Sequence, residues 1–383
     1  MGLVIIGLVM FGSRRWQFNT SWVSVCILRG SLNYATVMGI ICFSVKSTGS
    51  GGRLVAKNRK WYKWVCLILR IVMCGQFIHI YSSLMFLFKA SHIRTILIMR
   101  VFIYVVCGVY TAVIQFWYGD RVVDLVNSFL RLFQRIHALR GSEDVCYGSK
   151  WVLTLLLLKV IGLMYESCYL IPGRISDINA GYLLTTICEL YNTANASVML
   201  NVYFVAYLSI GIIYGQVNSY IRQELRQQLN ELKTINGTPA SRRKLKAAAQ
   251  RLDECLEIYD EIPRVVDSFH SLFEFPLCVV LMFKFLSIGS ITFFIMKNLG
   301  GVSLWFMVLK ILLDILLLTV AVHIARSNSR VIRWLSVENY YITNNKDWHM
   351  KVNIMIASLN ICMSMLMLTE LIRTIRFIIC STP

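Results

Sequence analysis

The sequence predicts an all-α, polytopic membrane protein with seven transmembrane helices, a cytoplasmic N-terminus and an extracellular C-terminus. Of its 383 residues, 57% are hydrophobic and only 15% are charged, whereas soluble domains carry about 25% charged residues. The mean hydropathy is +0.61. The other two observations are seven long apolar runs and a one-sided distribution of lysine and arginine. Such a chain is too poor in charge to cover a soluble core, so its apolar surface is expected to face lipid.

Seven apolar runs are each long enough to cross the ~30 Å hydrocarbon core, which takes about 20 helical residues. We expect the spans at residues 61–88, 95–118, 151–171, 180–214, 271–297, 302–325 and 352–379. Two N-terminal runs, 2–11 and 32–45, are too short to span, and we interpret the second as an interfacial or re-entrant segment. Between spans four and five, apolar stripes at helical spacing predict two amphipathic helices, with Pro263 as a kink.

These spans divide the chain into four parts. Residues 1–60 are expected to form a cytoplasmic N-terminal segment with short interfacial apolar stretches. Residues 61–214 hold spans one to four, residues 215–270 form a cytoplasmic helical loop or anchor, and residues 271–383 hold spans five to seven.

The basic residues set the orientation of the chain. With the N-terminus inside, 28 of the 39 lysines and arginines lie in cytoplasmic stretches, five lie in outer loops or helix ends, and six lie within spans. Cytoplasmic loops of membrane proteins carry an excess of basic residues. None of the three glycosylation sequons, at Asn19, Asn195 and Asn236, falls in an outer loop. The net charge of +19 therefore reflects topology, and no nucleic-acid partner is expected.

No motif for catalysis or cofactor binding is visible. The sequence contains no Walker loop, no GxSxG and no HExxH, and its 12 cysteines form no CxxC pair and no Cys/His cluster. An enzyme, a metal site and a bound cofactor are therefore not expected. No inverted repeat of interrupted helices is evident either, which disfavours a secondary transporter.

The end of the last span resembles a motif of the insect gustatory receptors. These receptors end helix 7 with Thr-Tyr, five mostly apolar residues and Gln-Phe. Here the window of nine residues runs from Thr369 to Phe377, six residues before the end of the sequence, with Glu370 and Arg376 in place of Tyr and Gln. The segment Leu28-Arg29-Gly30-Ser31-Leu32, followed by Tyr34, also resembles the opening of these receptors. The seven spans, the internal N-terminus and the tiny outer loops resemble the wider insect chemoreceptor superfamily.

The resemblance implies a ligand-gated, non-selective cation channel in the plasma membrane of sensory neurons. In that family four subunits surround a pore lined by helix 7, each subunit has a ligand pocket in the outer half of its bundle, and the inner parts of helices 4 to 7 hold the subunits together. The implied partners are membrane lipid, a small-molecule tastant and related receptor subunits. Apolar, aromatic outer helices suit small hydrophobic, bitter-type ligands better than sugars.

Candidate pocket residues are the aromatic, polar and charged side chains on the outer half-helices. They are His79, Tyr81, Arg100, Tyr104, Tyr165, Glu166, Tyr169, Tyr182, Glu189, Tyr191 and Trp305. Tyrosines near a membrane face also form interfacial belts, so the two acids are preferred, because a buried acid needs a partner.

Candidate pore or gate residues lie on the last span: Thr369, Glu370, Arg373, Thr374, Arg376 and Phe377. Glu370 and Arg373 share one helical face, where they either form an ion pair or line an aqueous path. Four copies of Arg376 around one pore would repel cations, so a heteromeric tetramer is favoured over a homomeric one. Lys159, Lys284, Lys310 and Arg70 lie within spans and are expected to face the bundle or to reach toward water.

Two other functions stay open at the level of sequence. An olfactory receptor of the same superfamily would share the topology, and a membrane transporter or scaffold would share the composition. A fourfold assembly with the last helix at its axis would exclude the transporter and the scaffold.

Overall fold

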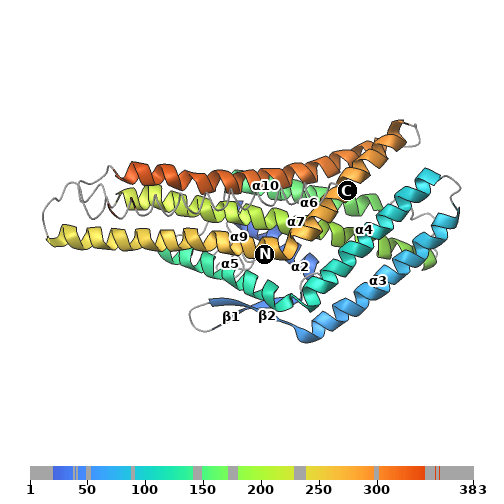
Figure 1. Ribbon diagram of the computed structural model, residues 1–383, viewed down its shortest axis with the longest axis horizontal. Helices are drawn as coiled ribbons and strands as arrows, with labels where there is room; N and C mark the ends of the chain where they lie inside the picture. Colours follow the sequence, from blue (N-terminus) through green and yellow to red (C-terminus); the bar gives the residue numbers. More distant parts are fainter. Residues whose placement is uncertain are drawn as a thin grey trace, which may run out of the picture. The chain divides into compact units, whose positions relative to one another are not determined.

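A computed structural model describes residues 20–37, 39, 42–48, 53–87, 91–140, 149–170, 180–227, 239–296 and 302–340, together with Met350 and Asn353. Figure 1 shows the elements in order, and nearly all are helices. They are α2 (Thr20–Val37), β1 (Phe43–Thr48), β2 (Arg53–Asn58), α3 (Lys60–Leu87), α4 (Ser91–Phe116), α5 (Gly119–Arg140), α6 (Lys150–Leu170), α7 (Ala180–Tyr220), a π-helical turn η2 (Ile221–Leu225), α9 (Pro239–Met296) and α10 (Val302–Tyr340).

Six of the seven predicted spans lie on helices, namely α3, α4, α6, α7, α9 and α10. Almost all of the seventh, at 352–379, lies outside the described residues. Within the described part, four helices are long and apolar enough to cross a membrane, or five if α4 and α5 count as one bent span. The protein is therefore a helical, multi-span membrane protein.

Helix α9 is much longer than the span predicted in its place. It contains 58 residues, which at 1.5 Å per residue amounts to about 87 Å, nearly three times the ~30 Å hydrocarbon thickness. The predicted second amphipathic helix and span five are one continuous helix, and Pro263 does not end it. Proline removes a single backbone donor, and the packed neighbours of a long helix can outweigh that loss.

A β-hairpin is the one departure from the all-α prediction among the described residues. Strands β1 and β2 pair antiparallel, from Phe43 opposite Asn58 to Thr48 opposite Arg53. The side chain of Asn127 on α5 holds the hairpin, accepting from the Ala56 amide at 2.8 Å and donating to the Ala56 carbonyl at 3.4 Å. The apolar run 32–45 is consequently divided between the end of α2 and the start of β1.

The described contacts group the chain into two compact units. Unit 1 comprises residues 1–131, 145–209 and 268–322, and unit 2 comprises residues 132–144, 210–267 and 323–383. Helices α5, α7, α9 and α10 contribute residues to both.

In unit 1, α3 and α4 run side by side in opposite directions (Figure 1). The turn at Gly39 packs closely against α3. Gly39 has a positive φ of 68°, and a Cβ at this position would lie 3.0 Å from the Cys66 sulfur. Only glycine adopts such a φ without a steric cost. The carbonyl of Gly39 accepts from Arg70 on α3 and from Gln115 on α4, so the segment after α2 is tied to both helices.

In unit 2, α7 packs closely on α10 through two glycines four residues apart. A Cβ at Gly211 would lie 3.0 Å from the Ile324 side chain and 3.2 Å from the Ala325 amide, and one at Gly215 would lie 3.3 Å from the Asn328 amide nitrogen. Small residues at this spacing let two helix backbones approach in membranes. Asn328 donates to the Gly211 carbonyl at 2.8 Å, which fixes the register of the two helices.

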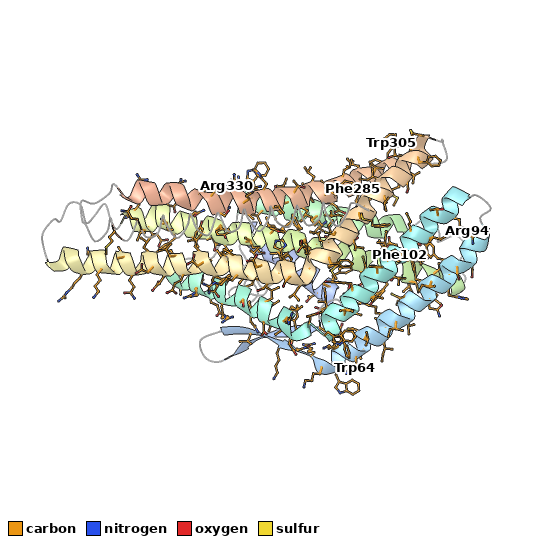
Figure 2. All side chains as sticks on the ribbon, viewed as in Figure 1. Trp64, Arg94, Phe102, Phe285, Trp305 and Arg330 are labelled. Atoms are coloured by element: carbon orange, nitrogen blue, oxygen red, sulfur yellow. The ribbon has the colours of Figure 1, made fainter. Side chains whose placement is uncertain are left out.

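Large apolar side chains are exposed along α3, α4, α9 and α10 in unit 1. Phe102 is 66% exposed and Phe285 61%, and Figure 2 labels both on the surface of their helices. Soluble monomers rarely expose contiguous apolar patches of more than a few hundred Å². These faces therefore fit contact with lipid or with further helices, as the composition predicts.

Candidate functional site

A seam of polar side chains joins α3 to α7 inside unit 1. Tyr81 donates to Glu189 at 3.1 Å, and Arg70 donates to Asn195 at 3.4 Å. Between them, the Cys74 thiol lies 3.6 Å from the Asn192 oxygen. The α3 positions descend along the helix as the α7 positions ascend, so the helices are antiparallel. The α7 partners recur every three residues, which places them on one helical face.

Aromatic rings surround the Tyr81 end of this seam. The ring centroids of Phe77 and Tyr81 lie 4.4 Å apart, and those of Phe77 and Tyr104 lie 5.5 Å apart in an edge-to-face arrangement. Phe283 on α9 adds a further ring 5.4 Å from Tyr104. We call Phe77, Tyr81, Tyr104, Phe283 and Glu189 the aromatic–acid cluster. A carboxyl group beside aromatic rings is the combination expected where an apolar ligand is held by a few polar contacts.

Three of the predicted pocket residues, Tyr81, Tyr104 and Glu189, meet in this cluster, and all three are buried. Thr193 on α7 also lies within hydrogen-bonding distance of the Tyr104 hydroxyl, at 3.4 Å. Tyr191 is buried as well, and its hydroxyl has no hydrogen-bond partner among the described residues.

The other predicted pocket residues are not brought into the cluster. His79 faces outward on α3, and Trp305 is 60% exposed at the start of α10, where Figure 2 labels it. Each of these two residues lies on the outward face of its helix in the described structure, so their role in a pocket stays a prediction. Tyr165 is half-buried, with its ring centroid 6.4 Å from that of Phe306. The side chains of Arg100, Glu166, Tyr169 and Tyr182 lie outside the described part of the structure.

The predicted pore residues, Thr369, Glu370, Arg373, Thr374, Arg376 and Phe377, all lie outside the described residues. Their arrangement stays a prediction.

The three lysines within spans were expected to face the bundle or to reach toward water, and they are buried around an acid that the sequence reasoning missed. Asp314 on α10 accepts from Lys159 of α6 at 2.6 Å and from Lys310 at 2.8 Å, and Lys284 of α9 lies 3.9 Å away. All four side chains are buried. The signal was present in the sequence, because Lys310 and Asp314 are four residues apart and so share a helical face. This ion cluster joins three helices of unit 1.

Arg70 is a buried cation of another kind. Its guanidinium donates to the oxygens of Gln115, Gly39 and Asn195, at 3.0, 3.3 and 3.4 Å, and each of these acceptors is neutral. Its Nε has no partner among the described residues. Burial, helped by the neighbouring Cys66, raises the pKa of the nearby Cys42 thiol to about 12, so this thiol supplies no negative charge. Arg70 therefore acts as a hydrogen-bonding hub and not as half of an ion pair in the described structure.

One cavity opens in unit 1, at the opposite end of α3 from Tyr81. Its volume is about 50 Å³, which suits a few water molecules and not a drug-sized ligand. Its lining is mostly apolar and comes from the hairpin, α4, α5, α7 and α9: Cys42, Phe43, Asn58, Thr111, Ile114, Gln115, Gly119, Val122, Val123, Met199, Val202 and Phe273. None of the predicted pocket residues lines it.

Comparison with known proteins gives a consistent result. The family described as "7tm Chemosensory receptor" matches residues 28–361. The chain is 33% identical over 343 residues to "Putative gustatory receptor 93b" of Drosophila melanogaster, covering 89% of this chain and 85% of the relative. It is 34% identical over 348 residues to "Putative gustatory receptor 93c" of the same organism, covering 88% and 86%. "Putative gustatory receptor 92a" is 27% identical over 308 residues, covering 80% and 78%.

Proposed function

This chain belongs to the 7tm chemosensory receptor family, and on that premise we propose that it is a subunit of a ligand-gated, non-selective cation channel that detects small hydrophobic tastants of the bitter type. Its relatives are gustatory receptors, and members of such a family are membrane receptors and not enzymes. The family also implies seven helices, and we propose that the segment at 352–379 is the remaining span. We place the receptor in the plasma membrane of sensory neurons.

The aromatic–acid cluster is the observation that supports the ligand proposal. Phe77, Tyr104 and Phe283 offer apolar ring surface, while Tyr81 and Glu189 offer a donor and an acceptor in a buried setting. A few polar groups among many apolar ones favour a hydrophobic ligand with one or two polar atoms. Sugars need many more hydrogen-bonding groups than this cluster contains.

The last span supports the proposal of a shared channel. In the predicted topology, helix 7 of four subunits lines the pore, and Arg373 and Arg376 would place positive charge beside the permeating cations. A tetramer that mixes this chain with related subunits would carry fewer arginines in its pore. We therefore propose a heteromer, held together by the inner parts of α7, α9 and α10.

A calcium-imaging or current measurement in cells tests these proposals together. The chain is expressed alone and with a related gustatory receptor subunit, and a panel of bitter, hydrophobic compounds is applied. We expect ligand-evoked cation current mainly from the co-expressed pair. A robust current from the chain alone would overturn the heteromer proposal.

Substitutions in the cluster test the ligand site in the same assay. Glu189→Ala, Glu189→Gln and Tyr81→Phe are expected to reduce ligand sensitivity by about tenfold, the effect of losing one buried polar contact of ~1.4 kcal/mol, with a smaller change in surface amount. Glu274→Gln, the same chemical change at an exposed acid of α9, is the matched control. Equal losses of surface amount and response would instead assign Tyr81 and Glu189 to folding alone.

A further inference from the structure

The start of α3, the end of α4 and the start of α5 meet at one end of unit 1. We call residues 57–64 and 116–121 the elbow. Lys63 donates to the Phe116 carbonyl at 2.7 Å, and the Trp64 and Phe116 rings meet edge to face at 4.6 Å. Asn58 donates to Asp120 at 3.2 Å. These contacts hold the three helix ends together, at a bend of 76° between α4 and α5.

Three tryptophans are exposed at the elbow. Trp61 is 85% exposed, Trp117 74% and Trp64 55%, and Figure 2 labels Trp64 at the outside of the molecule where α3 begins. Tryptophan is enriched where transmembrane helices meet the headgroup region, because its ring is apolar and its N–H is polar. The exposed apolar face of α3 continues directly from them, through Ile68 and Ile71. The elbow is therefore at the edge of the lipid-facing surface.

Basic side chains share the same place. The exposed ones are Lys57, Arg59, Lys60 and Arg121. The Lys63 ammonium group instead donates to the Phe116 carbonyl. The acids nearby are Asp120 and Asp124, so the described charges of the elbow and its flank are net positive. The first turns of α3 and α5 also direct the positive ends of their helix dipoles to this end of unit 1.

We propose that the elbow is a binding surface for the headgroups of anionic phospholipids. Its tryptophans sit at the depth of the glycerol and headgroup region, and the four exposed basic residues lie where a phosphate or a carboxylate of the headgroup would be. Basic clusters next to a transmembrane helix recognise anionic lipids in this way. In the predicted orientation, the elbow faces the cytoplasmic leaflet, where such lipids are concentrated. This surface is separate from the aromatic–acid cluster and does not depend on the proposed ligand.

The test uses the purified full-length chain in mixed micelles that contain equal amounts of dioleoyl phosphatidylserine and dioleoyl phosphatidylcholine. Native mass spectrometry measures the ratio in which the two lipids are retained. We expect the wild type to prefer phosphatidylserine, and the variant with Lys57→Gln, Arg59→Gln, Lys60→Gln and Arg121→Gln to lose that preference by about tenfold. The matched control carries Arg222→Gln, Arg243→Gln, Lys244→Gln and Lys246→Gln, which removes the same charge from exposed sites on η2 and α9. This control should retain the wild-type ratio.

Other results contradict the proposal. Equal loss of preference in the control would mean that total charge, and not the elbow, attracts the lipid. An elbow variant with the wild-type ratio would exclude the elbow, and one that changes oligomeric state at an unchanged ratio would assign the surface to a protein partner. Should the variant with four substitutions fold poorly, the wild type is photocrosslinked to a photoactivatable phosphatidylserine instead. Labelling within 57–64 or 116–121 supports the proposal, and labelling elsewhere overturns it.

Discussion

Asp314 accepts from Lys159 and Lys310 at 2.6 and 2.8 Å in unit 1, and all three side chains are buried. Taking an ammonium group out of water costs several kcal/mol unless an anion compensates it. Asp314→Asn keeps the shape of the side chain and removes that anion, so we expect a loss of roughly 3 kcal/mol or more in the free energy of unfolding. Thermal unfolding of the purified chain in detergent measures the loss. The control is Asp260→Asn, an exposed acid on α9, for which a change within about 0.5 kcal/mol is expected; equal melting temperatures for the two variants would contradict the prediction.

Residue type alone identified some residues of the candidate site but not which of them contact one another. Tyr81 and Glu189 could be chosen from sequence, because a buried acid and an aromatic with a polar tip are unusual within apolar spans. Their contact joins residues 108 positions apart, and no local pattern encodes such a distance. His79 was chosen by the same rule and lies on the outward face instead. Helix hydropathy is too uniform here to tell inward from outward faces, since lipid and core are equally apolar.

At the level of elements, the glycines of α7 set how closely it approaches α10. A Cβ at Gly211 would lie 3.2 Å from the backbone nitrogen of Ala325, and a backbone atom cannot move aside as a flexible side chain can. Gly211→Ala is therefore expected to destabilise the protein by about 1–3 kcal/mol. Gly162 on α6 is the matched control, since nothing lies within 4 Å of a Cβ there, and Gly162→Ala should be neutral or stabilise by about 0.5–1 kcal/mol through helix propensity. Thermal unfolding in detergent compares the two, and equal effects would show that close packing at Gly211 is not what the glycine provides.

The sequence predicted where helices occur better than where they end. Apolar length placed α3, α4 and α6 within a few residues of their observed bounds, because a span must match the bilayer. Helices α7, α9 and α10 run well beyond the bilayer length. Apolar stripes predicted the first part of α9 as a separate amphipathic helix, but they did not show that it continues into the fifth span without a break. The hairpin of β1 and β2 was missed, although a glycine-rich stretch at 49–52 between two β-prone runs is a hairpin signal.

At the level of the whole molecule, the net charge of +19 is informative through its placement. Lysine and arginine are retained on the cytoplasmic side during insertion. At the elbow, basic residues and tryptophans lie together at one end of α3, which is the arrangement that this rule predicts for a cytoplasmic helix end. The family implies seven helices, and we expect the remaining span at 352–379. With that odd number of spans, the two termini are predicted to lie on opposite sides of the membrane.

This orientation can be measured directly. We expect an epitope tag before Met1 to be labelled only after cells are permeabilised, and a tag after Pro383 to be labelled on intact cells, because the 28 basic residues assigned to the inner side resist translocation. Treatment with a glycosidase should leave the size of the chain unchanged, since the sequons at Asn19 and Asn236 would remain inside and Asn195 is buried among its hydrogen-bond partners. Labelling of the N-terminal tag on intact cells would reverse the assignment. It would also turn the elbow toward the outer leaflet, where anionic phospholipids are scarce. Retention of phosphatidylserine by the elbow is therefore expected only together with a cytoplasmic N-terminus.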